Sequence, residues 1–356
     1  MQAVPASNVV VALDPLLDPG DAGAVVELCT NFGRYRTYGE LEPIEIPEGP
    51  GLRQRHDSVR NFLTTGGLRR AEESMGTLAS RTSYFREEYA YGGTLLTGDI
   101  APFLYSERLA DAARAVHGRA VIEPQIAYAN LMVPGQELAV HTDVPEFRGV
   151  SRKTVPQWLL VVMHHSGLFD EWRLHIATGI GWFSDLDGGE LAYWPDGPDG
   201  PLTRHAIRTN TALVLDTDSV FHGVDRVATV AAAAMPRIEA GCGLRAEGDR
   251  WVLRSPSSDV LADYDWAELR LSVSWKAYCF ASDTDRGTWS DHADDLSLDT
   301  ILEALRADLS ARRAVDIPRN ADLGLALIDE YIRFPAIHAS AGVDCSSALM
   351  TGWSCG

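Results

Sequence analysis

The chain of 356 residues has few cysteines and no long hydrophobic run. Its five cysteines are scattered without a C-x-x-C pair, so the sequence indicates neither a disulfide framework nor a zinc knuckle. No apolar stretch reaches the roughly 20 residues that a membrane-spanning helix needs. The first residues also lack the basic segment and apolar run that are typical of a secretory signal. We therefore expect a cytoplasmic protein with reduced thiols and no membrane partner.

Positive charge is scarce as well. Lysine and arginine number 31 against 50 aspartates and glutamates, which gives a formal net charge of −19. This excess of negative charge disfavours a nucleic-acid partner, and no basic patch is large enough to override it. The sequence has no internal repeat and no low-complexity tract. A hydrophobic content of 46% allows a substantial core, and the composition is typical of a soluble intracellular enzyme.

Two short motifs far apart in the sequence provide a set of metal ligands. In His141-Thr142-Asp143 the two outer side chains are two positions apart, so on a β-strand they project from the same face. The apolar run from Thr211 to Asp216 predicts a buried strand that leads to His222. Two histidines and one carboxylate on one face of an octahedral Fe(II) leave three positions open, which suits an oxygenase. An H-x-D tripeptide by itself is a weak signal, because it occurs by chance.

The surroundings of the H-x-D motif strengthen this interpretation. Residues 126–138 predict a strand, a Pro-Gly turn and a second strand leading to His141, and G-G-E-L-A-Y-W-P follows at 188–195. Over residues 121–281 the chain thus resembles the Fe(II)/2-oxoglutarate-dependent dioxygenase superfamily, and within it the prolyl-4-hydroxylase-like branch. That resemblance implies an α+β fold with a double-stranded β-helix, a jelly-roll, cupin-like barrel, and flanking helices. It also implies Fe(2+) held by His141, Asp143 and His222, with 2-oxoglutarate and O2 as co-substrates.

The resemblance also implies an arginine for the distal carboxylate of 2-oxoglutarate. The arginine of the family's R-x-S strand would be Arg270, with Ser272 beside it on the same strand face. A buried guanidinium is costly unless a carboxylate pairs with it. Arg226 and Arg237 are competitors, although an exposed salt bridge suits these two better than Arg270.

The position of this arginine predicts an insertion. Arg270 lies 48 positions beyond His222 (270 − 222), whereas the family's basic residue usually follows the last histidine closely. Loop-like segments rich in small residues place the insertion at about 227–265. Long insertions at the open end of a barrel often shape the substrate pocket.

Other residues are candidates for the pocket by position. Tyr128 and Asn130 alternate on the strand before the metal motif, where they could hydrogen-bond 2-oxoglutarate. Arg148 and Arg152 follow the H-x-D motif and could steer an anionic substrate, although solvated loop charges are the simpler interpretation. Trp158 and Trp194 are candidates for the substrate pocket, because large aromatics commonly line such pockets, although they more often build the core. His164 and His165 lie in an apolar strand-like run, where core or turn histidines are the simpler interpretation.

Three regions are expected around this site. Residues 1–120 form an N-terminal α/β supporting region, 121–281 the catalytic core, and 282–356 a C-terminal helical region with a tail. Apolar residues at helical spacing predict helices at 22–31, 69–81, 107–116, 296–313 and 321–332. The last two helices could buttress the barrel or pair two subunits into a homodimer. The small, Ser/Gly-rich tail from Ala339 could fold over the mouth as a lid.

By this resemblance, the expected activity is hydroxylation of an unactivated C–H bond in a small molecule, such as an amino acid or a natural-product intermediate, with release of succinate and CO2. Desaturation, epoxidation and ring closure are alternatives in the same enzyme class. Halogenation is disfavoured, because halogenating members of the superfamily have a small residue where this chain has Asp143. A non-oxidative metal-dependent isomerase or lyase with a cupin-type barrel, and a catalytically inactive binding protein, are the alternatives from other classes.

Overall fold

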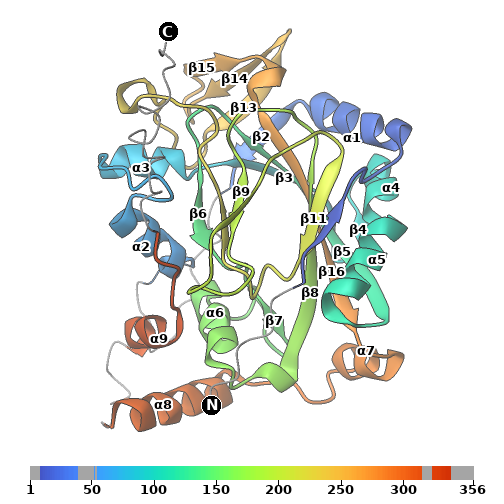
Figure 1. Ribbon diagram of the computed structural model, residues 1–356, viewed down its shortest axis with the longest axis vertical. Helices are drawn as coiled ribbons and strands as arrows, with labels where there is room; N and C mark the ends of the chain where they lie inside the picture. Colours follow the sequence, from blue (N-terminus) through green and yellow to red (C-terminus); the bar gives the residue numbers. More distant parts are fainter. Residues whose placement is uncertain (1–8, 39–51, 53, 315–322, 338–356) are drawn as a thin grey trace, which may run out of the picture.

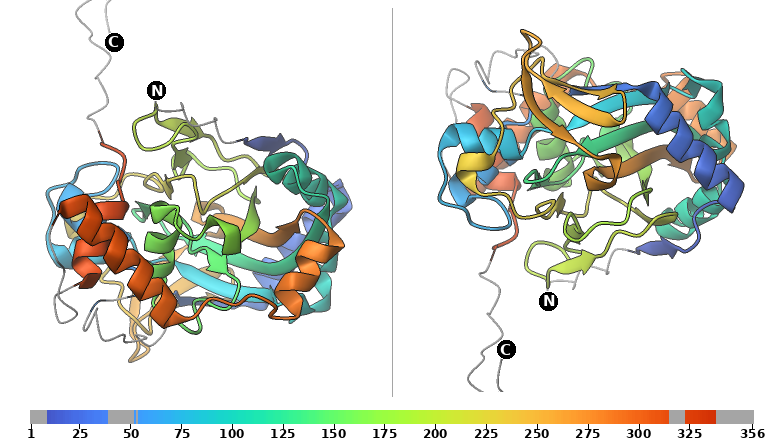
Figure 2. Two further views of the ribbon diagram at one scale, coloured as in Figure 1. Left: turned by 90° about the horizontal axis from the view of Figure 1, so that it is seen from below. Right: turned by 90° about the horizontal axis from the view of Figure 1, so that it is seen from above.

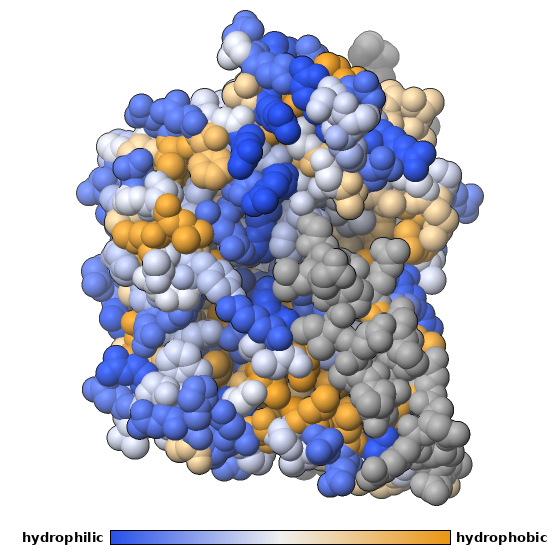
Figure 3. All heavy atoms as spheres, turned by 180° about the vertical axis from the view of Figure 1, so that it is seen from behind, coloured by the Kyte–Doolittle hydropathy of each residue, from blue (hydrophilic) through white to orange (hydrophobic). Residues whose placement is uncertain are grey.

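The computed structural model describes residues 9–38, 52, 54–314 and 323–337 (Figure 1). The expected lid from Ala339 onward and the first residues of the last expected helix lie outside these ranges. Within them, no helix is long and apolar enough to cross a membrane. Hydrophilic residues cover most of the face that Figure 3 shows, and apolar residues gather toward its lower part.

The fold is built on a large antiparallel sheet. Its strands follow the order β1-β11-β8-β16-β5-β3-β2-β13-β14-β15, with β4 added at β3 and β7 at β8. In that order they span Val11–Leu13, Thr211–Leu215, Arg173–Trp182, Arg270–Phe280, Val121–Met132, Phe85–Tyr91, Arg34–Thr37, Gly243–Glu247, Arg250–Arg254 and Val260–Tyr264, with β4 at Thr94–Leu95 and β7 at Glu146–Phe147. The long strands β5 and β16 are its centre, because they pair with each other over nearly their whole length.

A smaller antiparallel sheet faces the large one. Its order is β10-β9-β12-β6, with the strands at Thr203–His205, Leu191–Tyr193, His222–Val224 and Leu138–His141. Figure 1 shows β6 and β9 across the molecule from β8 and β11. Side chains from both sheets line one cavity, so the site lies between the two sheets. This arrangement confirms the prediction of a mixed fold with large antiparallel sheets.

Register decides which side chains of the large sheet face this cavity. Ser272 on β16 pairs with Asn130 on one side and with Trp182 on the other. Asn130 in turn pairs with Arg86 on β3. Paired residues of neighbouring strands share a face, and so do residues two apart on one strand. The polar alternation from Arg270 onward therefore faces the interior of the fold, as the sequence predicts.

The segment predicted as an insertion is a structured extension of the large sheet. After a 3-10 turn, η3, at Ala232–Ala234, strands β13, β14 and β15 form an antiparallel set that joins β2. Figure 1 shows these strands at the upper end of the molecule. No residue of 227–265 lines the cavity in the described part of the chain, so the insertion widens the sheet instead of shaping the pocket.

Helices cover the outer side of the large sheet. They are α1 (Pro19–Phe32), α4 (Ala101–Leu104) and α5 (Glu107–His117), after η1 at Gly98–Ile100. Proline in the first turn and Gly33 at φ 76° set the ends of α1, because only glycine adopts this left-handed conformation easily. The apolar faces of these helices enclose the main hydrophobic core against the sheet. This confirms the predicted helices at 22–31 and 107–116.

A second core forms around α6 (Gln157–Ser166), which the sequence suggested as a strand-like run. The predicted strand is wrong, because residues 157–166 form a helix. Seven consecutive residues of this helix are buried, and such a run does not distinguish a buried helix from a strand. Helices α8 (Leu298–Arg313) and α9 (Leu323–Tyr331) pack on α6 through their leucines and isoleucines. Their apolar stripes are thus used within the chain.

The remaining helices lie at the periphery. They are α2 (His56–Thr65), α3 (Met75–Arg81), α7 (Asp283–Ser290) and the 3-10 turns η2 (Asp170–Trp172) and η4 (Trp266–Glu268). The helix expected at 69–81 begins only at Met75, because Ser74 caps it by accepting a hydrogen bond from the Thr77 amide. In Figure 2 α8 and α7 lie on opposite sides of the lower end.

Candidate metal centre

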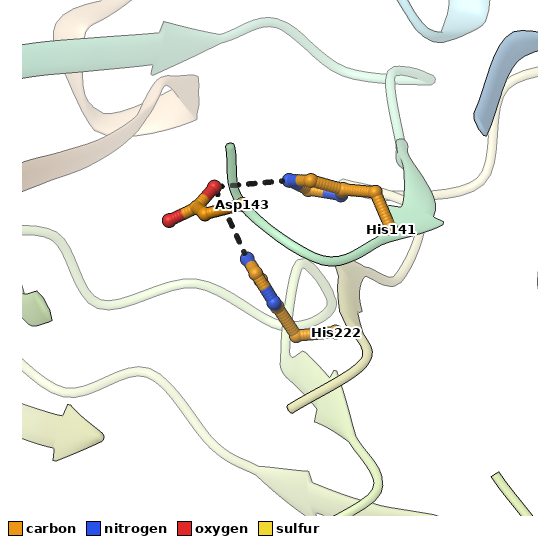
Figure 4. Close-up of side chains that lie close together, drawn as sticks. All are labelled: His141, Asp143 and His222. Atoms are coloured by element: carbon orange, nitrogen blue, oxygen red, sulfur yellow. Dashed lines mark ion pairs between the residues drawn. The ribbon is translucent and has the colours of Figure 1, made fainter. Parts of the chain in front are cut away.

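The smaller sheet brings the two predicted histidine ligands together. His141 is the last residue of β6, His222 is the first of β12, and the two residues are directly paired. Asp143 lies just beyond β6, where its backbone N–H donates to the Thr217 carbonyl at 2.8 Å. One ligand atom of each residue lies within 4.8 Å of the other two. Figure 4 shows the three side chains converging on one point from two strands and a turn.

Both imidazoles are oriented by backbone carbonyls. Nδ1 of His141 donates to the Ala139 carbonyl at 2.8 Å, and Nδ1 of His222 donates to the Val220 carbonyl at 2.9 Å. A carbonyl only accepts, so the proton of each neutral ring lies on Nδ1 and Nε2 is left to bind a cation. Burial lowers the pKa of His222 to about 4, which favours this neutral form at physiological pH.

The third ligand, Asp143, has its two carboxylate oxygens in different surroundings. Oδ1 lies 3.5 Å from Nε2 of His141 and 3.9 Å from Nε2 of His222 (Figure 4). Oδ2 accepts a hydrogen bond from Nζ of Lys276 at 2.7 Å. Burial acts to raise the pKa of this carboxyl, but the Lys276 ammonium and the two imidazoles hold it well below its usual range. Two neutral imidazoles and one carboxylate oxygen form a donor set that fits a divalent transition metal with open positions.

Lys276 is a site residue that sequence reasoning missed. It lies on the same face of β16 as Arg270 and Ser272. The two-residue alternation of side chains along this strand could have predicted it. Its side chain is nearly fully buried, and the Asp218 carboxylate lies near it. Among the described residues, both oxygens of Asp218 lack a hydrogen-bond partner.

Arg270 lies in the same cavity as the three metal ligands. Arg270 is only 2% exposed. Its Nε donates to the Gly189 carbonyl at 2.8 Å, and its Nη1 donates to the Ser272 hydroxyl at 3.1 Å. No carboxylate in the described part of the chain is within ion-pair distance of it. Burial lowers the pKa of the guanidinium to about 10, although Glu190 partly offsets this. The charge is therefore held in an environment that favours an incoming anion.

The two competing arginines already have carboxylate partners. Arg226 donates to Glu137 at 2.8 Å, and Arg237, with 85% of its side chain exposed, lies 3.3 Å from Glu239. Neither residue lines the cavity. Of these three candidate arginines, Arg270 is the one that lines the cavity, on the sheet opposite the two histidines.

The cavity encloses about 260 Å³. Its lining includes the predicted residues His141, Asp143, His222, Arg270, Ser272, Tyr128, Asn130 and Arg152.

Three predicted pocket residues lie elsewhere. Arg148 forms a bidentate ion pair with Asp294, through Nε and Nη2 at 2.7 Å each, and also donates to the Glu171 carbonyl. Trp158 and Trp194 are buried in the core around α6. These three residues do not line the cavity, because the two tryptophans are used in packing and the arginine in an ion pair.

Similarity to known proteins is confined to structure. No protein-family model matches the chain, and no curated protein sequence matches it. Solved structures of the 2-oxoglutarate-Fe(II) oxygenase family are similar at low identity. The non-haem α-ketoglutarate-dependent epimerase SnoN from nogalamycin biosynthesis has 10% identity and a TM-score of 0.39, over 77% of this chain and 79% of that one.

Two further solved structures have comparable scores. HygX from Streptomyces hygroscopicus, with nickel, 2-oxoglutarate and hygromycin B bound, has 10% identity and a TM-score of 0.37 over 77% of this chain and 84% of that one. A prolyl-4-hydroxylase from Pseudomonas putida has 13% identity and a TM-score of 0.30, over 74% of this chain and all of its own length. At this level of similarity, the function has to be argued from the site itself.

Proposed function

We propose that this protein is an Fe(II)- and 2-oxoglutarate-dependent oxygenase that hydroxylates a small molecule. The observation that carries the proposal is Arg270, a buried guanidinium without a carboxylate partner among the described residues, in one cavity with two histidines and an aspartate. A metal site alone would serve many reactions. A metal site with an unpaired guanidinium in the same cavity suits a co-substrate that has a chelating group at one end and a carboxylate at the other.

Strand order supports a jelly-roll barrel. Eight strands are divided equally between the two sheets: β5, β8, β11 and β16 belong to the large sheet, and β6, β9, β10 and β12 to the small one. In the large sheet the last strand, β16, lies between the first, β5, and the third, β8. Such interleaving of early and late strands is the pattern of a double Greek key, the basis of the double-stranded β-helix.

Each residue of the site has a defined task in this proposal. His141, Asp143 and His222 would hold iron through Nε2, Oδ1 and Nε2. Arg270 would bind the distal carboxylate of 2-oxoglutarate in a charge-assisted pair, and the Ser272 hydroxyl would hold the guanidinium in place.

The bound iron would supply the redox chemistry that couples oxidation of 2-oxoglutarate to succinate and CO2 with transfer of one oxygen atom from O2 to a C–H bond. The protein contributes fixed geometry and a cavity lined by both sheets, which limits the access of bulk water to the reacting groups. Hydroxylation is the proposed outcome, and a small molecule is the proposed substrate because the cavity between the two sheets has a volume of about 260 Å³.

The proposal is tested by anaerobic titration of the Fe(II)-loaded protein with 2-oxoglutarate. Chelation of iron by the 2-oxo acid is expected to produce a weak visible charge-transfer band. His222→Ala should lose the band together with the metal, whereas Arg270→Ala should keep the metal and require much more 2-oxoglutarate. Arg226→Ala is the matched control, because this arginine is paired with Glu137 outside the cavity.

Three results would contradict the proposal. Iron retention without any band would favour the non-oxidative isomerase or lyase. Failure of the wild type to retain iron would favour a binding protein. An Arg270→Ala variant with unchanged affinity for 2-oxoglutarate would remove the co-substrate assignment.

A further inference from the structure

The cavity is cationic in a strongly acidic protein. Its lining contains five positively charged side chains, Arg55, Arg86, Arg152, Arg270 and Lys276, and one carboxylate, Asp143. The whole chain, in contrast, has a formal net charge of −19. Because buried and half-buried cations are costly without anions, this local reversal of charge points to anionic ligands.

Three of these cations are accounted for. Lys276 pairs with Asp143. Arg55 lies 3.1 Å from Asp57 and donates to the Thr142 carbonyl at 2.9 Å. Arg270 is assigned to the distal carboxylate of 2-oxoglutarate in the proposed function. This leaves Arg86 and Arg152.

Arg86 is held rigidly at the cavity wall. Its guanidinium carbon lies 3.5 Å from the centre of the Tyr128 ring and 4.8 Å from that of Tyr38, so the cation is flanked by two aromatic faces. Only 11% of the side chain is exposed. Stacking of this kind orients a guanidinium plane and leaves its edge free for a planar anion.

The hydrogen bonds of Arg86 are incomplete. Nη2 donates to Glu88 at 3.0 Å, but the Glu88 side chain is 40% exposed, so this ion pair is weak. Nε is buried and has no hydrogen-bond partner among the described residues. Asn130, the cross-strand neighbour of Arg86, likewise has a buried Oδ1 without a partner. An unpaired donor and an unpaired acceptor are therefore carried by paired residues of β3 and β5, both of which line the cavity.

2-Oxoglutarate does not account for Arg86. Its two carboxylates are used in the proposed function, one at Arg270 and one in the chelating group at the metal. Arg86 is on β3, which β5 separates from the β16 strand that carries Arg270. Neighbouring strands are about 4.8 Å apart, so the two strands are separated by about 10 Å. Two different anions are needed to serve these two arginines.

Arg152 is the weaker candidate for a fixed subsite. Its one hydrogen bond in the described structure, from Nη2 to the Val144 carbonyl, is 3.5 Å long, and no aromatic ring holds it in place. It lines the cavity close to Asp143 and is partly exposed. A half-exposed cation with one long hydrogen bond suits attraction of an anion more than fixed recognition.

We propose that the substrate is a small organic carboxylate, and that its carboxylate binds the edge of the Arg86 guanidinium between Tyr38 and Tyr128. This rests on the proposed function, in which a second anion occupies Arg270. The carbon skeleton lies along the apolar lining, which includes Ile126, Val144, Ile180 and Leu191.

The test uses the full-length protein loaded with Ni(II), which binds the ligands without turnover, and saturated with 2-oxoglutarate. Calorimetric titrations compare a panel of aliphatic, aromatic and 2-hydroxy carboxylates with their primary amides, which have the same shape without the charge. At least one carboxylate should bind with at least tenfold higher affinity than its amide. Arg86→Gln should reduce this affinity at least tenfold and leave the affinity for 2-oxoglutarate unchanged.

Matched controls and a prior titration separate the possible failures. Arg36→Gln, on the neighbouring strand and 74% exposed, should bind the carboxylate as the wild type does. Equal binding of carboxylate and amide, no binding of any panel carboxylate, unchanged affinity in Arg86→Gln, or a loss confined to Arg152→Gln would each overturn the assignment. Because 2-oxoglutarate binding is measured first, its absence identifies a failure of the proposed function itself and removes the present assignment with it.

Discussion

The ammonium of Lys276 donates to the outer carboxylate oxygen of Asp143 at 2.7 Å, while the other oxygen faces the two histidines. Lys276 thereby fixes the rotation of the carboxylate and leaves one oxygen for a metal. It also neutralises a buried charge when no metal is bound. The lysine and a divalent cation are thus alternative sources of compensation for the same carboxylate, which has consequences for stability.

Lys276→Met should destabilise the metal-free protein more than the metal-loaded protein. Without the ammonium, the partly buried Asp143 carboxylate loses the positive charge beside it, and breaking such a pair costs up to about 3 kcal/mol. A bound divalent ion replaces part of that compensation. Urea unfolding of both proteins, with and without Ni(II), checks this, with Lys153→Gln as an exposed-lysine control. Equal losses in the two states would show that Lys276 acts independently of the metal.

Metal retention should depend on the three predicted ligands and not on nearby histidines. Alanine at His141, Asp143 or His222 should lower the bound metal per chain from about one to near zero, because each supplies one of three protein ligand atoms. His165 lies beside the site, with its ring stacked on Phe221, and His165→Ala should keep the metal. Metal content after dialysis, on samples with native circular dichroism, decides between these outcomes. Retention by His222→Ala would refute the ligand assignment.

Arg148→Gln should affect stability and leave the cavity unchanged. The substitution removes a bidentate ion pair with Asp294, which is partly exposed, so the expected loss is about 1–2 kcal/mol of unfolding free energy. Affinity for 2-oxoglutarate should stay within twofold of the wild type. Arg152→Gln is the variant for comparison, because Arg152 lines the cavity and has no carboxylate partner in the described part of the chain. A loss of 2-oxoglutarate affinity in Arg148→Gln would restore it as a site residue.

Asp218→Asn should raise the stability of the metal-free protein at high pH. Burial raises the pKa of Asp218 from 3.8 to about 7, although Lys276 partly offsets this, so its ionised form is disfavoured by folding. The destabilisation is absent below about pH 4, grows up to about pH 7 and is complete above it. The melting temperature of the variant should therefore exceed that of the wild type at pH 8, and the gap should narrow as the pH falls to 4. A gap that does not depend on pH would rule out ionisation as its cause.

The metal ligands were predictable because their signal is local. The H-x-D spacing predicts that two side chains point the same way, and the buried strand before His222 marks the third residue. β6 ends at His141, so Asp143 reaches the site from the residues that follow the strand. Arg270 and Ser272 follow from the same period on β16. Lys276 lies on the same strand face, but no short motif marks it. Its role in the site follows from its contact with Asp143, which lies across the cavity from β16.

The rest of the site depends on pairing between distant segments. Arg86 reaches the cavity because β3 joins the edge of β5, a pairing that its own sequence does not specify. The interior of α6 carries apolar residues on every face, so its periodicity did not separate helix from strand. Segments rich in glycine and serine suggested loops at 227–265, where backbone pairing with β2 instead produces three strands. Arg148 is held away from the cavity by Asp294 and by the Glu171 carbonyl, two partners far along the chain.

The most direct test of the account compares 2-oxoglutarate with 2-oxopentanoate, which keeps the chelating 2-oxo acid and lacks the distal carboxylate. With the Ni(II)-loaded wild type, 2-oxoglutarate should bind about 10–100-fold more tightly, the range expected for a charge-assisted hydrogen-bonded pair. In Arg270→Leu the two acids should bind with similar affinity, whereas Arg86→Gln should keep the wild-type preference. If the wild type does not distinguish the two acids, or if Arg270→Leu keeps the preference, Arg270 does not hold a co-substrate carboxylate and the proposed oxygenase site is wrong.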